Sequence, residues 1–495
     1  MRTLIVLCFS VSGIIFLTNH DAYCQDIKTD ALLTKVDEAM NFKVYPRSIQ
    51  KFGKGHSYFI EQSQRPNGPF AVNYFTFSAT ILPEKGKGQH VLNIQIQPGR
   101  FLPMKFIIDG EISGLKFGSN YRPLKEGIDE ELYLSPEYII TSAKLGHAKY
   151  LKDSLVEGVP HSIISFTWKQ FPVRLFVNLN SYLPGRIEII RHYIDDVPYL
   201  WGDIKKIIQY SFWELVDKKV HYPFQKDIFI GGKHWQSFTL DSVKLDLPVS
   251  TDSLSIPDSA KISLQKSYKA LNPFNEPEVE SKEIYNGIHF IQGKSGQLGS
   301  YNCSFINTNS GIIVLEAPVT SGYSKSVINE IKRLYPDKKI AGVITTSDAW
   351  PHVGGIREYV AQKIPVYLLD LNVTLINKLL KANYYTNTDS YQLRKIPADL
   401  RKILMKTVIG SGDERIEIYP VRTETGERMM MVYFPKYKLL YTSDLIQSAK
   451  KLSPMLLQYL SEIDGAVKRE KLDPETVFGM HLPPTNYSSI INELE

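Results

Sequence analysis

Cysteine is scarce in this sequence, which has only three cysteines in 495 residues. Cys8 and Cys24 lie in an N-terminal segment that we expect to be removed, which leaves Cys303 as the one remaining thiol. A single thiol cannot form an intramolecular disulfide, so the sequence excludes a small disulfide-bonded scaffold. We therefore expect stability to come from packed hydrophobic cores, with Cys303 as a small buried residue beside a strand rather than a nucleophile.

A large excess of charge of one sign is also missing. The 58 lysines and arginines outnumber the 52 aspartates and glutamates only slightly, and the two kinds are mixed along the chain. Without a basic stripe or a platform of stacking residues, nothing supports a nucleic-acid partner. Beyond residue 24 there is no run of about eighteen apolar residues, so we expect no transmembrane segment and a soluble mature chain.

The N-terminus carries the pattern of an export signal. Arg2 supplies a positive charge, and the apolar run Leu4–Leu17 has the length of a secretory segment but is too short to span a bilayer. Ala22 and Cys24 are small residues that suit a cleavage just after Cys24. The alternative is a lipoprotein with Cys24 as its lipidated first residue. Tyr23 disfavours it, because the lipoprotein motif has a small residue at that place. We expect a periplasmic or secreted protein.

The chain that remains after cleavage is too long for one hydrophobic core of ordinary size. Residues 25–257 follow mainly period-two alternation, residues 258–281 are polar and without period, and residues 282–495 alternate strands with helices. We predict a signal sequence over 1–24, a mainly antiparallel β domain over 25–257, a linker over 258–281 and an α/β domain over 282–495.

In the N-terminal half, the alternation predicts an antiparallel sheet with one buried face, preceded by an amphipathic helix over Leu32–Phe42. Strands are expected over Tyr74–Leu82, His90–Ile96, Lys105–Ile108, His161–Trp168, Val173–Leu179 and Arg186–Tyr193. The tryptophans either line a groove or fill the core of the sheet, and we favour the core; they are Trp168, Trp201, Trp213 and Trp235. The pattern loosely resembles the curved half-barrel sheets of bacterial lipoprotein-carrier and envelope-sensor domains.

The C-terminal half has the alternation of an α/β layered domain. Strands are expected over Gly287–Gly293, Asn302–Thr308, Gly311–Leu315, Ile340–Ile344 and Val366–Leu369, with helices over Ser324–Tyr335 and after Gly354–Gly355. In such folds, polar segments at the carboxyl ends of strands are where chemistry tends to lie.

One of those polar segments carries a resemblance to a known family. Residues 344–359, Ile-Thr-Thr-Ser-Asp-Ala-Trp-Pro-His-Val-Gly-Gly-Ile-Arg-Glu-Tyr, resemble the signature loop of the metallo-β-lactamase superfamily. In that loop a buried strand ends in Thr-His-x-His-x-Asp-His and is followed by x-Gly-Gly and a helix. The resemblance implies an αββα sandwich with two zinc ions that activate a bridging water.

This sequence departs from the family at most of the metal ligands. With His352 and Gly354–Gly355 in register, Ser347 and Ala349 stand in place of two histidines and Pro351 stands in place of the aspartate. Only His352 of the family's first ligand loop remains.

Three later segments resemble the other ligand loops of the family. Pro420–Glu424 has Arg422 where a histidine is expected, Glu427–Asp444 ends in the metal-bridging Asp444, and Phe478–Thr485 keeps a histidine at His481. By this resemblance the first metal position has lost its histidines, while His352, Asp444 and His481 remain for the second.

The resemblance leaves two functions open for this site. Two histidines and one carboxylate suffice for a catalytic zinc ion with an open water position, and Asp444 or Asp348 could accept a proton. The protein would then be an exported single-metal hydrolase of an ester, amide, thioester or phosphoester from a small or envelope-derived substrate. On the alternative reading, Arg422 replaces the lost cation and pairs with Asp444, which leaves an inactive binding or scaffolding protein.

Other residues of the loop have simpler roles to weigh. Asp348 could be a turn or helix-capping residue, Ser347 lacks an evident base that would make it a nucleophile, and Trp350 is expected to shape the pocket. A third function places the activity in the N-terminal sheet, as a lipid or lipoprotein carrier regulated by the second domain. No motif identifies a substrate or an oligomeric state.

Overall fold

The structure is a computed structural model, and it describes residues 27–42, 46–58, 72–97, 100–123, 128–193, 200–270, 274–293, 301–447 and 454–494. The expected signal sequence, residues 1–24, lies outside these ranges. The chain divides into two compact units: the N-terminal unit comprises the described parts of Met1–Phe59, Ala71–Arg191 and Ile204–Gln265, and the C-terminal unit those of His192–Asp203 and Lys266–Glu495. No helix in the described ranges has both the length and the apolar character needed to cross a membrane.

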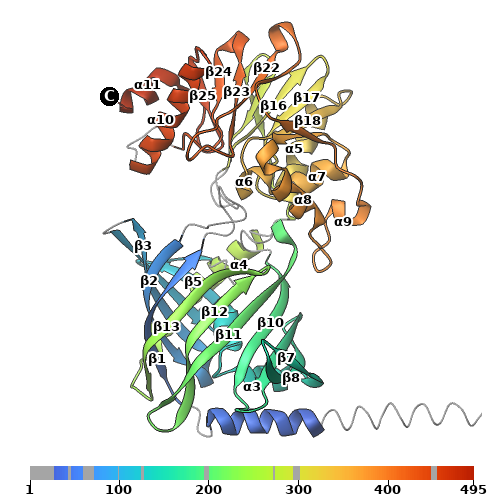
Figure 1. Ribbon diagram of the computed structural model, residues 1–495. Helices are drawn as coiled ribbons and strands as arrows, with labels where there is room; N and C mark the ends of the chain where they lie inside the picture. Colours follow the sequence, from blue (N-terminus) through green and yellow to red (C-terminus); the bar gives the residue numbers. More distant parts are fainter. Residues whose placement is uncertain are drawn as a thin grey trace, which may run out of the picture. The chain divides into compact units, whose positions relative to one another are not determined.

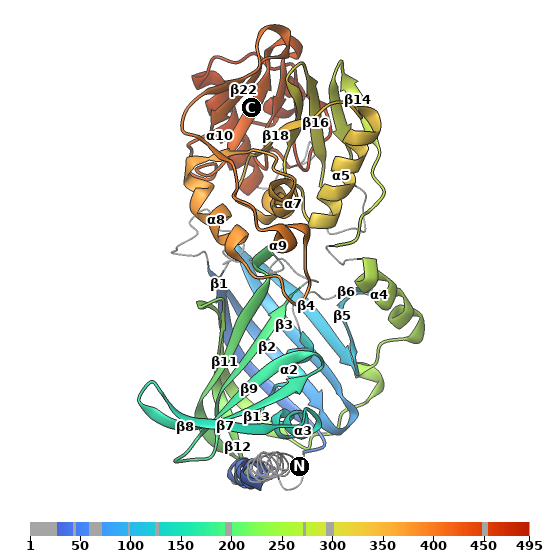
Figure 2. The ribbon, with the colours of Figure 1, turned by 90° about the vertical axis from the view of Figure 1, so that its right-hand side faces the viewer.

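The N-terminal unit is built on one 13-stranded sheet, in the order β6-β5-β4-β3-β2-β1-β13-β12-β11-β10-β9-β8-β7. The sheet is strongly curved (Figures 1 and 2). Its strands are β1 (Ile49–Tyr58), β2 (Val72–Leu82), β3 (Lys87–Gln97), β4 (Arg100–Asp109), β5 (Ile112–Phe117), β6 (Asn120–Pro123), β7 (Lys149–Val156), β8 (Val159–Trp168), β9 (Phe171–Asn178), β10 (Pro184–His192), β11 (Asp203–Val216), β12 (Val220–Ile230) and β13 (Lys233–Leu245). A sheet-rich N-terminal half is therefore confirmed, and all six expected strands overlap observed ones.

Helices cover the buried face of this sheet. The helix over residues 27–40 places Leu33, Val36 and Met40 in a core shared with strands β8 to β12, as its periodicity predicts. Helices α2 (Ile128–Tyr133) and α3 (Ile139–Leu145) lie on the same side. Trp168 belongs to this core, which confirms the expectation that it fills the sheet rather than lining a groove. Trp201, expected in the N-terminal domain, belongs to the C-terminal unit.

The segment expected to be an irregular linker contains a helix, α4 (Asp258–Ala270). Two contacts explain why the helix forms in this polar sequence. Leu264 is buried, and the amine of Lys261 lies 2.9 Å from Oδ2 of Asp109 in the sheet. Asp258 in the first turn also stabilises the helix N-terminus through its negative charge.

The C-terminal unit contains two sheets. The seven-stranded sheet has the order β14-β15-β16-β17-β18-β19-β20 and the six-stranded sheet β21-β22-β23-β24-β25-β26. The strands are β14 (Ser281–Tyr285), β15 (Ile288–Ile291), β16 (Cys303–Thr308), β17 (Gly311–Leu315), β18 (Ile340–Thr345), β19 (Val366–Leu369), β20 (Leu400–Ile403), β21 (Thr407–Ile409), β22 (Ile416–Pro420), β23 (Met430–Phe434), β24 (Leu439–Tyr441), β25 (Thr476–Phe478) and β26 (Thr485–Asn486). Each strand expected in this half overlaps an observed one.

Hydrophobic clusters show how these sheets are layered. One cluster lies between the two sheets, with Ile313 and Ile344 from the first sheet against Ile418 and Val432 from the second. Helices cover the other face of each sheet, and they include α5 (Ser321–Leu334), α7 (Ile356–Ala361) and α8 (Val373–Lys381) on the first and α10 (Pro454–Arg469) and α11 (Tyr487–Ile491) on the second. The short helices α6 (Trp350–Val353) and α9 (Ser390–Arg394) complete the unit. Cys303 is buried in β16, as expected.

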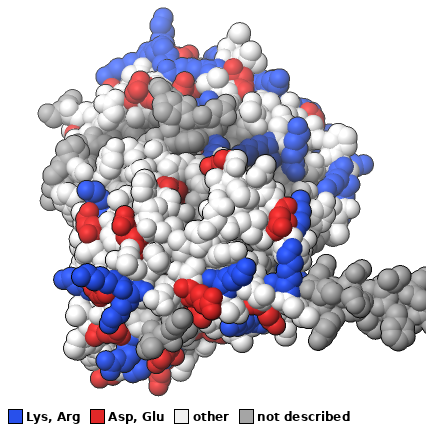
Figure 3. All heavy atoms as spheres, turned by 60° about the horizontal axis from the view of Figure 1, so that its bottom comes forward, with Lys and Arg blue, Asp and Glu red and all other residues white. Residues whose placement is uncertain are grey.

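Charge on the surface is mixed, as the composition implies. On the face shown in Figure 3, lysine and arginine side chains lie among aspartate and glutamate side chains rather than gathering in a patch of one sign.

Candidate functional site

Four loops bring the candidate residues together at one edge of the C-terminal unit. Strands β17 and β18 are parallel neighbours in one sheet, and β24 and β25 are parallel neighbours in the other. Parallel strands end at the same edge of a sheet, and each of these four is followed at its carboxyl end by a polar residue of the site. The residues are Glu316 after β17, His352 in α6 after β18, Asp444 after β24 and His481 after β25.

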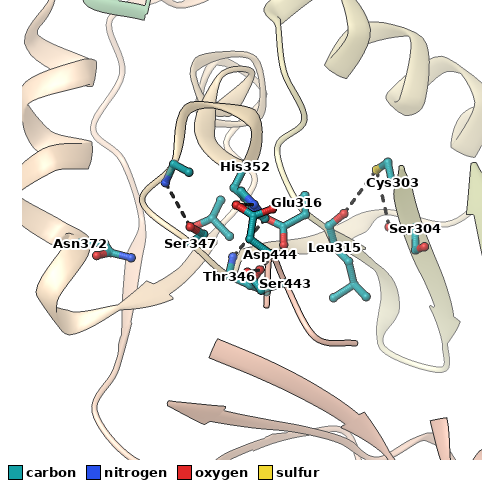
Figure 4. A network of polar contacts seen from close by, with 12 residues as sticks. Cys303, Ser304, Leu315, Glu316, Thr346, Ser347, His352, Asn372, Ser443 and Asp444 are labelled. Carbon is teal, nitrogen blue, oxygen red and sulfur yellow. Dashed lines mark hydrogen bonds and ion pairs between the residues drawn. The ribbon is translucent and has the colours of Figure 1, made fainter. Parts of the chain in front are cut away.

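These four side chains form a series of ion pairs. Figure 4 shows three of them, Glu316, His352 and Asp444. Nδ1 of His352 lies 3.0 Å from Oε2 of Glu316, and its Nε2 lies 2.9 Å from Oδ2 of Asp444. The other oxygen of Asp444, Oδ1, lies 3.1 Å from Nε2 of His481. Both ring nitrogens of His352 therefore face carboxylates, at angles that make these contacts ion pairs rather than well-aligned hydrogen bonds.

Burial and neighbouring charges together determine the protonation of His352 and Asp444. Burial lowers the pKa of His352, but Asp444 and Glu316 outweigh it and raise the pKa to about 10. Burial raises the pKa of Asp444, but His352 and His481 outweigh it and hold the pKa well below its usual range. At neutral pH, His352 is therefore an imidazolium clamped between two carboxylates, with its side chain fully buried.

The backbone and two hydroxyl groups hold Glu316 in place. The Thr346 amide donates to Oε2 of Glu316 at 3.1 Å, and the Thr346 hydroxyl donates to Oε1. The hydroxyl groups of Thr346 and Ser443 lie 2.8 Å apart. Glu316 and Ser443 both adopt left-handed backbone conformations, with φ of 75° and 56°. Such conformations cost a non-glycine residue about 1–2 kcal/mol, so the surrounding contacts must maintain them.

Gly355 lets the helix after the loop approach the rest of the site. A Cβ atom at this position would lie 1.8 Å from Oγ of Ser324 and 2.7 Å from the carbonyl oxygen of Thr320. No side chain fits there unless Ser324 and the backbone of Thr320 move, so this position requires a glycine.

Asp348 lies beside this chain of ion pairs and has an unusual protonation state. Its side chain is 7% exposed, and Oδ2 has no hydrogen-bond partner among the described residues. Burial raises the pKa of Asp348 to about 7, against the opposing effect of Arg428, whose Nε lies 4.0 Å from Oδ2. At neutral pH this carboxyl group can hold or release a proton.

The pairing of Arg422 with Asp444, which the alternative interpretation of the sequence required, is wrong. Nη2 of Arg422 lies 2.6 Å from Oδ1 of Asp370, and it also donates to the carbonyl oxygen of Leu404 at 3.3 Å. The left-handed backbone of Arg422, with φ of 56°, accompanies this orientation. The guanidinium therefore neither replaces a zinc ion beside Asp444 nor plugs the site.

The remaining residues of the loop have structural positions. Ser347 is fully buried, and its hydroxyl oxygen accepts a hydrogen bond from the Ala349 amide at 3.2 Å, which closes a turn. The carbonyl oxygen of Pro351 accepts from the amide of Val319 at 2.9 Å. Trp350 belongs to the hydrophobic core beside the first sheet, where its ring lies edge-on to that of Tyr301, with centroids 5.4 Å apart. None of these residues is placed to act as a nucleophile.

The predicted zinc ligands do not fit a metal ion in this arrangement. A shared ion would need the nitrogen and oxygen atoms of His352, Asp444 and His481 to face one common point about 2 Å from each. Instead the atoms face one another in pairs, and both nitrogens of His352 are taken up by carboxylates. Over the described ranges, no group of three or more histidine, cysteine, aspartate or glutamate side chains is arranged to hold a metal ion.

Sequence reasoning missed two residues of the site. Glu316 is the carboxylate that faces Nδ1 of His352, and its signal was its place directly after the continuous apolar strand Gly311–Leu315. Tyr301 packs edge-on to His481, with ring centroids 5.1 Å apart. Burial raises the pKa of Tyr301 to about 12, and Asp444 contributes to the rise, so its hydroxyl remains protonated. No pattern in the sequence indicated Tyr301.

Comparison with protein-family models and with curated proteins gives no match. Among solved structures, a metallo-β-lactamase from Pontibacter korlensis is 15% identical, with 44% of this chain and 97% of that chain covered and a TM-score of 0.36. The DIM-1 metallo-β-lactamase is 14% identical over 44% of this chain and 95% of its own, with a TM-score of 0.35. A double mutant of the sec-alkyl sulfatase PisA1 is 14% identical over 44% of this chain and 40% of its own, with a TM-score of 0.33. Similarity at this level carries no conclusion about activity.

Proposed function

We propose that the C-terminal unit is a metallo-β-lactamase-type αββα domain that works without a metal ion, as a binding or scaffolding domain. The motif resemblance of residues 344–359 and of the three later loops supports the family. Two facing sheets with helices on their outer faces agree with that family's architecture. The support for a metal-free role comes from the residues at the site rather than from the fold.

The observation that carries this proposal is the position of His352 between Glu316 and Asp444, 3.0 and 2.9 Å from its two ring nitrogens. A histidine that binds zinc keeps one nitrogen unprotonated for the metal and donates from the other. His352 instead holds a proton on both nitrogens, because two buried carboxylates face it. The imidazolium thus supplies the positive charge that a metal supplies in the family.

Metal content tests this proposal directly. We expect the full chain, purified without chelators, to hold far less than one zinc, manganese or iron ion per molecule by elemental analysis. We also expect a chelator to leave its melting temperature unchanged, because a ligand that stabilises the native state would lower the melting temperature when removed.

The His481→Ala variant separates a bound metal ion from an adventitious one. About one ion per chain in the wild type, lost in His481→Ala and accompanied by a chelator-induced drop in melting temperature, would sink the metal-free proposal and favour a single-metal hydrolase. Trace metal of equal amount in both proteins leaves the proposal standing.

We also propose that the mature chain begins after Cys24 and acts outside the cytoplasm on a small or envelope-derived ligand. The support is the charged start, the apolar run Leu4–Leu17 and the small residues before the cleavage point. The intact mass of the protein isolated from a cell-envelope or secreted fraction should lack residues 1–24. A mass that includes them, or one that carries a lipid on Cys24, contradicts this proposal.

A further inference from the structure

A polar bowl lies at the other end of the C-terminal unit from His352. Its cavity volume is about 430 Å³, within the range of small-molecule sites. The first sheet contributes the turn at Gly287, Asn307 at the end of β16, and Lys338. The second sheet contributes Asp413 before β22 and Lys436 before β24.

Strand direction shows that the bowl and the ion-pair site are separate. Lys338 precedes β18 and Lys436 precedes β24, whereas the other ends of these two strands lead to His352 and Asp444. The six residues of β18 span about 20 Å at about 3.3 Å per residue. The bowl therefore makes no use of the residues of the proposed function, and its occupancy can be tested independently.

The walls of the bowl combine hydrogen-bond donors and acceptors from turns and strand ends. The side chains of Asn286, Asn307 and Asn309 line it, and amide groups both donate and accept. Asp413 and Glu414 add carboxylate acceptors. Phe434 and three isoleucines at strand ends are the apolar residues of the lining.

Such a lining matches one class of ligand. Hydroxyl groups of a sugar donate and accept hydrogen bonds at neighbouring positions, while its C–H groups lie against apolar side chains. An aliphatic or flat aromatic ligand would cover these polar and charged groups without bonding to them, and would incur the cost of their desolvation. The volume suits one or two sugar rings rather than a polymer.

The contacts of the lysine and arginine side chains that line the bowl indicate that the ligand carries one anionic group. Lys436 lies 3.0 Å from Oδ2 of Asp413, and Nε of Arg415 lies 2.9 Å from Oε1 of Glu417. Lys338 differs, since the hydrogen bonds that the structure gives its amine go to neutral oxygens, the side-chain oxygen of Asn307 and the carbonyl oxygen of Thr308. Its charge is available to an anion without breaking an ion pair.

We propose that this bowl binds a polyhydroxylated ligand of sugar size that carries one acidic group, with the acidic group against Lys338. The hydroxyl groups bond to the asparagine amides and to the carboxylates of Asp413 and Glu414. A uronic acid has this chemistry.

Isothermal titration and saturation-transfer NMR on the full chain test the proposal with glucuronate, glucose and inorganic phosphate as probes. We expect glucuronate to bind more tightly than either glucose or phosphate. We expect Lys338→Gln, which keeps the polar side chain and removes the charge, to weaken glucuronate binding by about tenfold.

Lys332→Gln is the matched control, because Lys332 is an exposed lysine of α5 that bonds to Gln362 and does not line the bowl. It should bind glucuronate as the wild type does, and all three proteins should melt at the same temperature. The proposal is overturned if neither sugar binds, if phosphate binds as tightly as glucuronate, or if Lys338→Gln binds glucuronate as well as Lys332→Gln does.

Discussion

Replacement of His352 by alanine is expected to destabilise the C-terminal unit by about 3–5 kcal/mol, because it leaves two buried carboxylates without their shared cation. Glu316 is fully buried and Asp444 nearly so, and each loses an ion pair. Calorimetry of the full chain should show one of its unfolding transitions shifted to lower temperature, while the transition of the N-terminal unit stays in place.

Two variants serve as controls for this result. His481→Ala removes a partly exposed side chain with one ion pair to Asp444, and should cost less than His352→Ala. Adding Glu316→Gln to His352→Ala removes one of the two carboxylates that His352 no longer neutralises. The double variant should therefore recover part of the lost stability. If His352→Ala costs no more than His481→Ala, the imidazolium does not hold the site together.

The stabilising effect of His352 has a predictable pH dependence. The pKa of His352 is raised in the folded protein from 6.5 to about 10, so its stabilising effect is fully present below pH 6.5 and is lost as pH rises through about 10. The stability advantage of the wild type over His352→Ala should therefore shrink at alkaline pH.

Asp348→Asn is expected to stabilise the C-terminal unit above neutral pH, by up to about 4 kcal/mol near pH 8. Burial raises the pKa of Asp348 from 3.8 to about 7 in the folded protein. The preference of the folded state for the protonated form is fully present below pH 3.8 and is lost as pH rises through about 7. An asparagine imitates the protonated acid and never carries the buried charge. Urea unfolding at several pH values measures the difference.

Asp337→Asn is the matched control for this series, because Asp337 is an exposed residue in the turn before β18. Its stability difference from the wild type should stay small and nearly constant with pH. A difference between Asp348→Asn and the wild type that does not grow from pH 4 to pH 8 would show that Asp348 ionises as an ordinary surface acid does.

Much of the fold could be predicted from the spacing of apolar residues, wherever a strand or helix keeps one regular spacing along its length. The continuous apolar strands Gly311–Leu315 and Val366–Leu369 have the predicted bounds, since both faces of a central strand are buried. The long strands β11, β12 and β13 were not predicted. Their alternation is broken, by the left-handed backbone of Phe212 in β11 and by a register shift at Ile228/Phe229 in β12.

The sequence predicted three of the residues of the candidate site, but neither Glu316 nor the arrangement of the side chains. His352, Asp444 and His481 do lie together, as the loop resemblance implied. The sequence could not reveal that the ring of His352 turns its two nitrogens toward carboxylates. Nor could it reveal that Arg422 turns toward Asp370, because that direction depends on a left-handed backbone dihedral that no residue type enforces.

The pairing of β1 with β13 constrains the order in which the N-terminal unit can form. Ile49 pairs with Leu245, which lies far along the chain. Until synthesis delivers β13, the half-sheets from β1 to β6 and from β7 to β12 have no bridge, and β1 presents an open edge. The unit closes only when its last strand inserts beside its first, so its assembly is gated by the residues that arrive latest.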